Sequence, residues 1–272
     1  MPVKTSARKR QTQFSTLGVF SFGLLLILSL PHRVDATVLD WPSAPGWTAG
    51  APAAGETVTQ SFTADSPNDV TVSINNNDLG PQGATWQGGY PTIDSTTKTG
   101  GLSGVNGLQL SVASESSTSS FIRTTITFAT PVAGLTLQIW DVDAAPGQFV
   151  DKVSSIQANA VGGGIVGATS VTSAVPGYNV ISGSGLSTVV LGTSAASDST
   201  NQGTINITFS GQITQFSFDY SNNDSGLGAQ GIAIGSLTYA IVPESTPFFC
   251  VALLCAIAIG LDGCRRRNNA SR

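Results

Sequence analysis

The feature that most constrains the fold is a series of short segments, between Thr37 and Ile241, in which apolar and polar residues alternate. Alternation with a period of two places every second side chain on one face of an extended strand. No apolar stripe of helical period and length interrupts the series. The alternating segments are residues 70–74, 107–112, 122–128, 135–140, 153–158, 204–209, 213–218 and 232–239. We therefore predict an all-β domain whose strands each bury one face.

The segments between these strands are rich in Gly, Asn, Pro and Asp, which are the residues that turns require. Eight or more antiparallel strands joined by such turns are typical of a two-sheet sandwich of jelly-roll type. No Pro/Ser-rich linker divides the region. We predict a single antiparallel β-sandwich over residues 37–241, with a break into two units near Gly100 and Gly101 as the alternative.

Residues 1–36 have the three parts of a secretory signal peptide. A basic start is followed by an apolar stretch over residues 17–30, and then by Val34-Asp35-Ala36, with small residues at positions −3 and −1 of a cleavage site. We predict export and cleavage by signal peptidase after Ala36. The alternative is a permanent N-terminal anchor, although this stretch is short for a membrane span of about 20 residues.

The C-terminal region, residues 242–272, has three parts as well. A short motif over 242–247 begins with Val242, Pro243 and Glu244, and an apolar segment over 248–261 is predicted to be a transmembrane helix. The Arg-rich end, residues 265–272, begins with Arg265, Arg266 and Arg267. By the positive-inside rule, the arginines act as a cytoplasmic stop-transfer signal. They place residues 37–241, which we call the body, on the far side of the inner membrane.

This tripartite tail resembles the PEP-CTERM sorting signal of bacterial exported proteins, and Ser245 stands where that family usually has a second proline. The resemblance implies a Gram-negative bacterium that secretes exopolysaccharide. It also implies that an exosortase, a membrane-embedded protease, cuts near Pro243 and Glu244 and leaves the body at the cell surface or in the extracellular biofilm matrix. The alternatives are an uncleaved, tail-anchored periplasmic protein and a buried core helix.

Composition excludes several function classes for the body. His32 is the only histidine and the three cysteines are Cys250, Cys255 and Cys264, so residues 37–241 contain neither residue type. A Ser-His-Asp triad, a thiolate nucleophile and a histidine-ligated or cysteine-ligated metal are therefore excluded there. The same residues carry 13 acidic and 3 basic side chains, a net charge of −10. This charge argues against a nucleic-acid partner.

The motif most suited to chemistry is the strand end at Asp141 and Asp143, followed by Asp151. Asp141 and Asp143 lie on one face of a strand, about 6.6 Å apart by the strand rise. Because Ca²⁺ prefers carboxylate and carbonyl oxygens, these three aspartates form a candidate calcium site. Solvated strand-end and turn residues are the first alternative, and a glycosidase carboxylate pair is the second. No catalytic residue and no other cofactor are predicted.

Two further features bear on binding. Residues 76–83 and 222–231 are similar in sequence, and they are either two similar turns or a shared binding rim. Trp86 and Tyr90 lie in a Gly-rich segment and either stack on sugar rings or pack against the core. We interpret the chain as an exported, non-catalytic module that binds exopolysaccharide or other surface proteins. The alternative is a carbohydrate-active enzyme that uses Asp carboxylates.

Overall fold

The computed structural model describes residues 36–42, 46–66, 69–77, 85–113, 120–226 and 228–243. These residues form β-strands and no helix, and the strand pairings among them are antiparallel. The prediction of an all-β antiparallel fold is therefore confirmed. Within these ranges, no helix has the length and apolarity needed to cross a membrane. The predicted signal peptide as far as residue 35 and the predicted tail from residue 244 lie outside the described residues.

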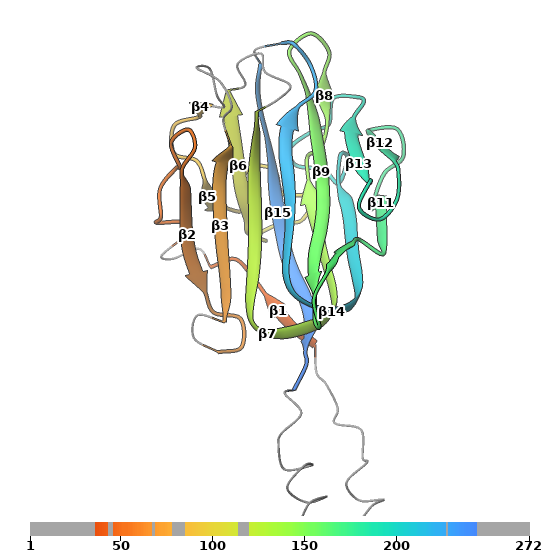
Figure 1. The fold of residues 1–272 in the computed structure, drawn as a ribbon. Coiled ribbons are helices and arrows are strands. Elements are labelled where there is room, and N and C mark those ends of the chain that lie inside the picture. The colour runs from red at the N-terminus through yellow and green to blue at the C-terminus, as the bar shows by residue number, and fades with distance from the viewer. Residues whose placement is uncertain are drawn as a thin grey trace, which may run out of the picture. The chain divides into compact units, whose positions relative to one another are not determined.

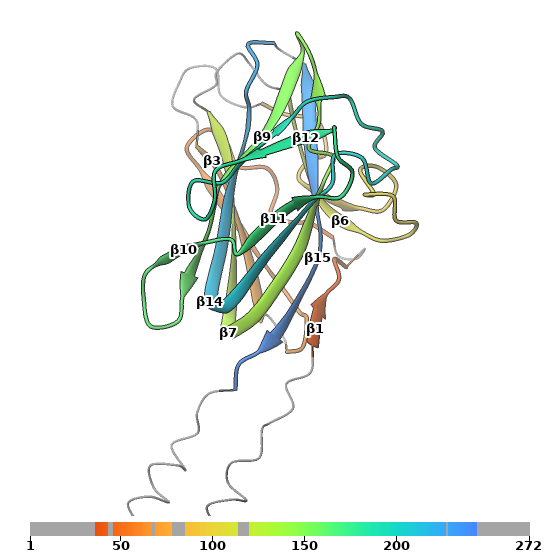
Figure 2. The ribbon, with the colours of Figure 1, turned by 90° about the vertical axis from the view of Figure 1, so that its right-hand side faces the viewer.

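The strands form two layers that face each other (Figures 1 and 2). One layer contains, in spatial order, β2 (Thr57–Phe62), β3 (Val70–Asn77), β7 (Phe121–Trp140), β14 (Ile205–Asn222), β9 (Phe149–Ala160), β13 (Val189–Gly192) and β12 (Asn179–Ser182). The other layer contains, in spatial order, β11 (Ser170–Ser173), β14, β7 and β15 (Ala229–Ile241), so β14 and β7 occur in both layers. Two further strands, β6 (Gly107–Ala113) and β1 (Ala36–Leu39), pair with β15 along its other edge.

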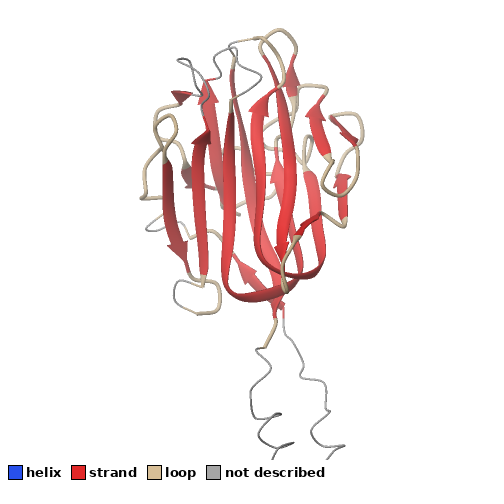
Figure 3. Ribbon diagram, in the orientation of Figure 1, coloured by secondary structure: helices blue, strands red, loops and turns tan. Residues whose placement is uncertain are grey.

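Four short strands complete these layers. Strands β4 (Thr85–Trp86) and β5 (Thr92–Asp94) pair with β6, whereas β8 (Ala144–Ala145) and β10 (Ile165–Gly167) pair with β9. Figure 3 shows the layers built of strands alone, with loops joining them. The architecture is an antiparallel β-sandwich.

Strands β7 and β14 belong to both layers because their shared ladder bends. The first half of β7 pairs with β3 and with the second half of β14, whereas the second half of β7 pairs with β15 and with the first half of β14. Register shifts in β14 lie between Phe209 and Gln212 and between Ile213 and Gln215. Bulges of this kind bend a strand and increase its twist. The segments 122–128 and 135–140, predicted as separate strands, are therefore one continuous strand.

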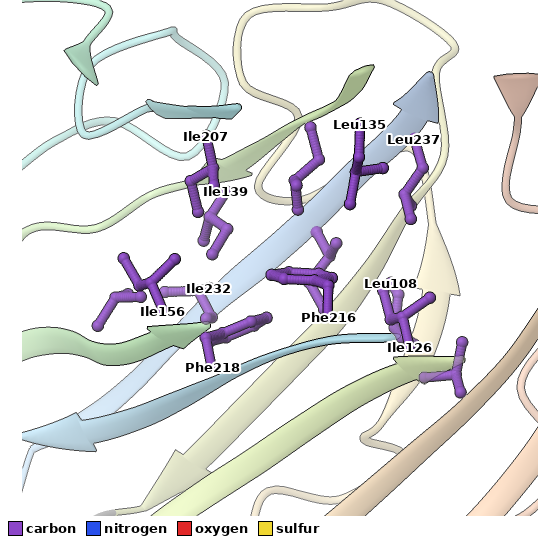
Figure 4. Close-up of a cluster of buried hydrophobic side chains, with 14 of the residues drawn as sticks. Leu108, Ile126, Leu135, Ile139, Ile156, Ile207, Phe216, Phe218, Ile232 and Leu237 are labelled. Carbon is purple, nitrogen blue, oxygen red and sulfur yellow. The ribbon is translucent and has the colours of Figure 1, made fainter. Parts of the chain in front are cut away.

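The core lies between the layers, where the apolar members of each alternating strand meet (Figure 4). In β7 every second residue is buried from Ile122 to Phe128, and the alternation resumes in the opposite phase from Leu135 to Ile139. Phe216 lies in the middle, with ring centroids 5.8 Å from those of Phe209 and Phe218. The side chains labelled in Figure 4 are Leu108, Ile126, Leu135, Ile139, Ile156, Ile207, Phe216, Phe218, Ile232 and Leu237.

Candidate binding site

The three aspartates identified from the sequence lie where β7 ends and β9 begins. Trp140, the last residue of β7, is buried and positions this segment. A Cβ on Gly107 or Gly235 would come within 2.7 Å of the Trp140 ring, so these glycines make room for the indole. Asp141 follows with φ of 66°, in the left-handed region that Asp enters more readily than most residues. The chain therefore turns sharply at the first carboxylate.

Asp151, on β9, is fully buried and links this turn to the neighbouring strand β14. The Tyr220 hydroxyl donates to Asp151 Oδ1 at 2.7 Å, and the backbone N–H of Asp143 donates to Asp151 Oδ2 at 3.2 Å. Burial raises the pKa of Asp151 well above its ordinary value, and the Tyr220 hydrogen bond opposes this shift only in part. Asp151 therefore holds the turn in place from inside the protein.

Asp143 fixes a second loop to the same turn. Its Oδ2 accepts a hydrogen bond of 2.7 Å from the backbone N–H of Ala196, and its backbone carbonyl accepts one of 2.9 Å from Asp151 N–H. Burial raises the pKa of Asp143, whereas the bond from Ala196 lowers it. Asp143 thereby holds the loop after β13 beside the end of β7.

Asp141 forms an ion pair with a lysine from a distant part of the sequence. Lys98 Nζ lies 2.5 Å from Asp141 Oδ2 and 4.0 Å from Asp198 Oδ1. Burial raises the pKa of Asp141 to about 7, although the charge and hydrogen bond of Lys98 oppose the shift. Burial by itself lowers the pKa of Lys98, but the charge of Asp141, the hydrogen bond to it and the charges of Asp198 and Asp151 together outweigh burial, and the net shift is upward. At Asp141 burial is the larger influence, because only its Oδ2 contacts the ammonium.

These groups line a polar cleft of about 390 Å³. Carboxylates, one ammonium, side-chain amides, hydroxyls and two half-buried aromatic rings surround it. The residues that form its walls are Gln87, Tyr90, Thr97, Lys98, Ser111, Asp141, Asp143, Ala145, Phe149, Ala195, Ala196, Asp198, Ala229, Gln230 and Gly231. The aromatic rings and the polar groups together offer a ligand both apolar and hydrogen-bonding contacts.

Two residues that line the cleft each have a buried side-chain oxygen without a hydrogen-bond partner. They are Asp141, through Oδ1, and Gln230, through Oε1, and these residues are only 5% and 4% exposed. Successive side chains of a strand face opposite sides, so Gln230 shares the core-facing side of β15 with Ile232, whereas Gly231 faces Lys98. Leaving a buried polar atom unsatisfied costs about 1–3 kcal/mol, and a ligand hydroxyl, which can donate or accept, would satisfy Asp141 Oδ1.

The structure thus brings Asp141, Asp143 and Asp151 together, but each has a protein partner. Their side chains are buried, so the interpretation of Asp141 and Asp143 as solvated turn residues is wrong. Among the described residues, no group of three His, Cys, Asp or Glu side chains is placed to hold a metal ion. Calcium at these aspartates stays a prediction. The sequence analysis did not identify Lys98, because only the folded chain places it next to Asp141.

The remaining sequence features are the similar segments 76–83 and 222–231 and the aromatic pair Trp86 and Tyr90. Asn222 and Asp224 stabilise their turn and connect it to the β8–β9 segment. Asn222 Oδ1 accepts from the backbone N–H groups of Asp224 and Val150, and Asp224 Oδ2 accepts from Gly147 N–H. The similar residues 78–83 lie outside the described ranges, which leaves the shared rim untested. Trp86 packs against the core and donates to a backbone carbonyl, whereas Tyr90 lines the cleft.

Fold and cleft together define an antiparallel β-sandwich with a polar cleft. No protein-family model and no curated protein matches the chain. Among solved structures, it is similar to a family 11 carbohydrate-binding module from Clostridium thermocellum in complex with a β-1,3-1,4-mixed-linked tetrasaccharide. It is similar too to the family 11 module of the cellulosomal cellulase Lic26A-Cel5E of that organism. In both comparisons the identity is 13% and the TM-score 0.31, over 78% and 79% of this chain and 99% of each module.

Proposed function

We propose that the chain is an exported, non-catalytic polysaccharide-binding protein of the cell surface or extracellular matrix, and that the cleft is its binding site. The observation that carries the proposal is Asp141 Oδ1, a buried oxygen of a residue in the cleft wall that has no hydrogen-bond partner. A sugar hydroxyl can both donate and accept a hydrogen bond, so it would satisfy this carboxyl in either protonation state. Tyr90 and Phe149 line the same cleft, and aromatic rings offer apolar faces to sugar rings.

The charge of the body narrows the class of polysaccharide. Residues 37–241 carry a net charge of −10, and the cleft is lined by three aspartates and one lysine. A strongly anionic polymer would be repelled by this distribution. We therefore propose a neutral or cationic exopolysaccharide as the partner.

Binding is tested on the full chain, purified in a mild detergent, by titration with exopolysaccharide from the native host. We expect Tyr90→Ala to weaken binding by about tenfold, because it removes one aromatic wall of the cleft. The matched control is Tyr178→Ala, since Tyr178 does not line the cleft and is likewise partly buried. Equal affinity of the two variants and the unaltered chain would place binding elsewhere.

One observation favours catalysis as a second candidate function. Burial raises the pKa of Asp141 to about 7, and a carboxyl that is protonated near neutral pH is what a glycosidase uses as its general acid. Asp143, which lines the same cleft, would be its ionised partner. Release of reducing ends from the polysaccharide, abolished by Asp141→Asn, would establish the enzyme, whereas binding without release supports the binding module.

The proposed export route concerns the two ends of the chain. It includes cleavage after Ala36, transient anchoring in the inner membrane by residues 248–261 and exosortase cleavage at the PEP-CTERM-like motif. The backbone N–H of Val242 donates to the carbonyl of Pro131, so a cut after this point would leave β15 whole.

The mass of the protein recovered from its native host tests this route. We expect the unaltered chain to end near residue 243 and to lack the arginines at 265–267. A variant with Pro243→Ala and Glu244→Ala should keep its tail and stay in the membrane. Retention of the arginines by both proteins would instead indicate an uncleaved, tail-anchored periplasmic protein.

A further inference from the structure

The hairpin that joins β9 to β10 has an uninterrupted exposed apolar surface. Residues 161–166 read Val-Gly-Gly-Gly-Ile-Val, and all six are exposed. Val161, Ile165 and Val166 are 44%, 56% and 40% exposed, and no polar side chain separates them. Exposed apolar side chains that adjoin one another mark interaction sites, because water covers such a surface unfavourably. We call residues 161–166 the apolar hairpin.

The turn of the apolar hairpin is held by its own backbone. Gly162, Gly163 and Gly164 have φ of 91°, 97° and 92°, values that residues with a Cβ rarely adopt. The backbone N–H of Ala160 closes the turn by donating to the carbonyl of Gly164 at 3.0 Å. Within the part of the chain that the structure describes, no atom beyond the chain neighbours lies within 4 Å of a Cβ placed on these glycines. The turn therefore projects from the body without being packed against it.

The apolar hairpin lies at the end of the sandwich where β15 leaves it. Ile241 on β15 pairs with Val132 on β7. Val132 pairs in turn with Ile213 on β14, which pairs with Ala160 directly before the hairpin. Neighbouring strands are about 4.8 Å apart, so these three steps span about 15 Å. Figure 2 shows β10 and the end of β15 in the same half of the sandwich.

The length of the chain after β15 places the membrane beside this end of the body. Residues 248–261, the proposed membrane anchor, begin seven residues after Ile241. Seven residues reach at most about 25 Å when fully extended, so the end of β15 stays within that distance of the anchor. The N-terminal strand β1 starts at the same place, because Ala36 pairs with Ala240. A retained N-terminal anchor would therefore hold the same end of the body at the membrane.

The strands that meet at this end carry no charge over long segments. The segments without Asp, Glu, Lys or Arg are 124–140, 153–197, 199–218 and 225–243. They contain the bend of β7 and β14, the end of β9 and the whole apolar hairpin. Asp65 and Asp69 come near Tyr239 at this end, but they belong to the turn after β2. The hairpin can therefore enter a bilayer surface without bringing a costly charge with it.

A lipid surface suits the apolar hairpin better than an added protein strand does. Strand β10 has only three residues, and Ala168, directly after it, already forms a bridge with Gly185. So short an edge offers few N–H and C=O groups to a pairing strand. Insertion at a lipid surface instead uses the apolar side chains, and it strengthens with the apolar area that is covered.

We propose that the apolar hairpin inserts into the lipid surface beside the membrane anchor while the tail is uncut; this inference rests on the proposed anchoring by residues 248–261. The tether keeps the hairpin within reach of the bilayer, so even a weak contact is maintained. Strand β9 runs from Phe149 in the cleft wall to Ala160, a length of about 36 Å by the strand rise. The docked hairpin thus points the cleft away from the membrane, toward the polysaccharide.

Quenching by brominated lipid tests the proposal on the full chain in vesicles of phosphatidylethanolamine and phosphatidylglycerol. Ile165→Trp adds a fluorophore to the hairpin, and Val180→Trp on β12 is the control, because these residues are 56% and 49% exposed. Val180 pairs with Leu191, which pairs with Lys152 near the start of β9, so the control lies at the other end of that strand. Lipid brominated near the headgroup should quench the added emission of Ile165→Trp at least about twofold more than that of Val180→Trp.

A second pair of variants controls for the affinity of tryptophan itself for the membrane interface. Adding Val161→Asp to Ile165→Trp places a charge beside the new ring, and it should lower the excess quenching at least about twofold. Adding Ser182→Asp to Val180→Trp places the same charge on β12, where residue 182 is exposed. We expect that control to leave the weaker quenching unchanged.

Flotation of the vesicles separates this inference from the proposed anchoring. A chain that floats with the vesicles, but in which Ile165→Trp and Val180→Trp are quenched equally, overturns docking and leaves anchoring in place. A chain that stays behind when the vesicles float overturns both. A blue shift of the Ile165→Trp emission that is the same with and without brominated lipid indicates a second copy of the chain on the hairpin, and it overturns docking to lipid alone.

Discussion

Replacing Asp141 with asparagine should change how stability depends on pH. The folded-state pKa of Asp141 is about 7, against 3.8 for the ordinary carboxyl, because the side chain is buried. Between these values the folded chain holds a proton that the unfolded chain has released, so the free energy of unfolding falls as pH rises. The full shift is equivalent to about 4 kcal/mol, of which about 3 kcal/mol falls between pH 4 and pH 7.

Asparagine has the shape of a protonated aspartate and does not titrate. Near pH 4 the variant and the unaltered chain should therefore have similar stability, and near pH 7 the variant should be the more stable by about 3 kcal/mol. Urea unfolding followed by tryptophan fluorescence, at intervals across this pH range, measures the difference. The control is Asp65→Asn, at an exposed carboxylate.

Parallel curves for Asp141→Asn and the unaltered chain would refute this reasoning. They would mean that Lys98 keeps Asp141 ionised throughout, and that the ion pair outweighs burial. In that case the variant would be the less stable at every pH, because it would leave a buried ammonium without its partner.

Two further predictions concern the framework of the site and the core. A Cβ on Gly192 would lie 1.8 Å from the carbonyl oxygen of Asp143, so Gly192→Ala should destabilise the chain by more than about 2 kcal/mol in urea unfolding. Gly211→Ala, where nothing lies within 4 Å, is the control and should change stability by less than about 1 kcal/mol. Phe216→Ala should cost about 3–5 kcal/mol in the same assay, since it opens a cavity between the layers; a loss below about 1 kcal/mol would contradict the described core.

Much of the fold could be predicted because a strand that buries one face has alternating apolar and polar residues in its sequence. The alternation in 70–74 corresponds to β3, which buries one face, whereas 107–112 and 232–239 correspond to β6 and β15, in which residues 107–112 and 230–235 are buried on both faces. Short strands such as β10 and β13 have only three or four residues, too few for a period to be recognised. Both strands form by hydrogen-bonded pairing with β9, which is distant from β13 in sequence.

The candidate site was predicted in part. Asp141, Asp143 and Asp151 are close in sequence, and the structure confirms that they are close in space. Their partners were not predicted, since Tyr220 and Lys98 come from segments 69 and 43 residues away. No local pattern marks a residue whose importance depends on which distant strand it meets.

The sequence by itself determined the class of fold, because a period of two is a property of the extended chain and needs no knowledge of its neighbours. It also excluded histidine and cysteine chemistry from the body, since those residue types are missing there. Only the tertiary structure decided that β7 and β14 share one bent ladder through both layers. It likewise decided that Lys98 meets Asp141 in one cleft. The physical reason is that register and strand order are set by contacts between residues distant in sequence, and the same contacts determine burial, pairing and pKa.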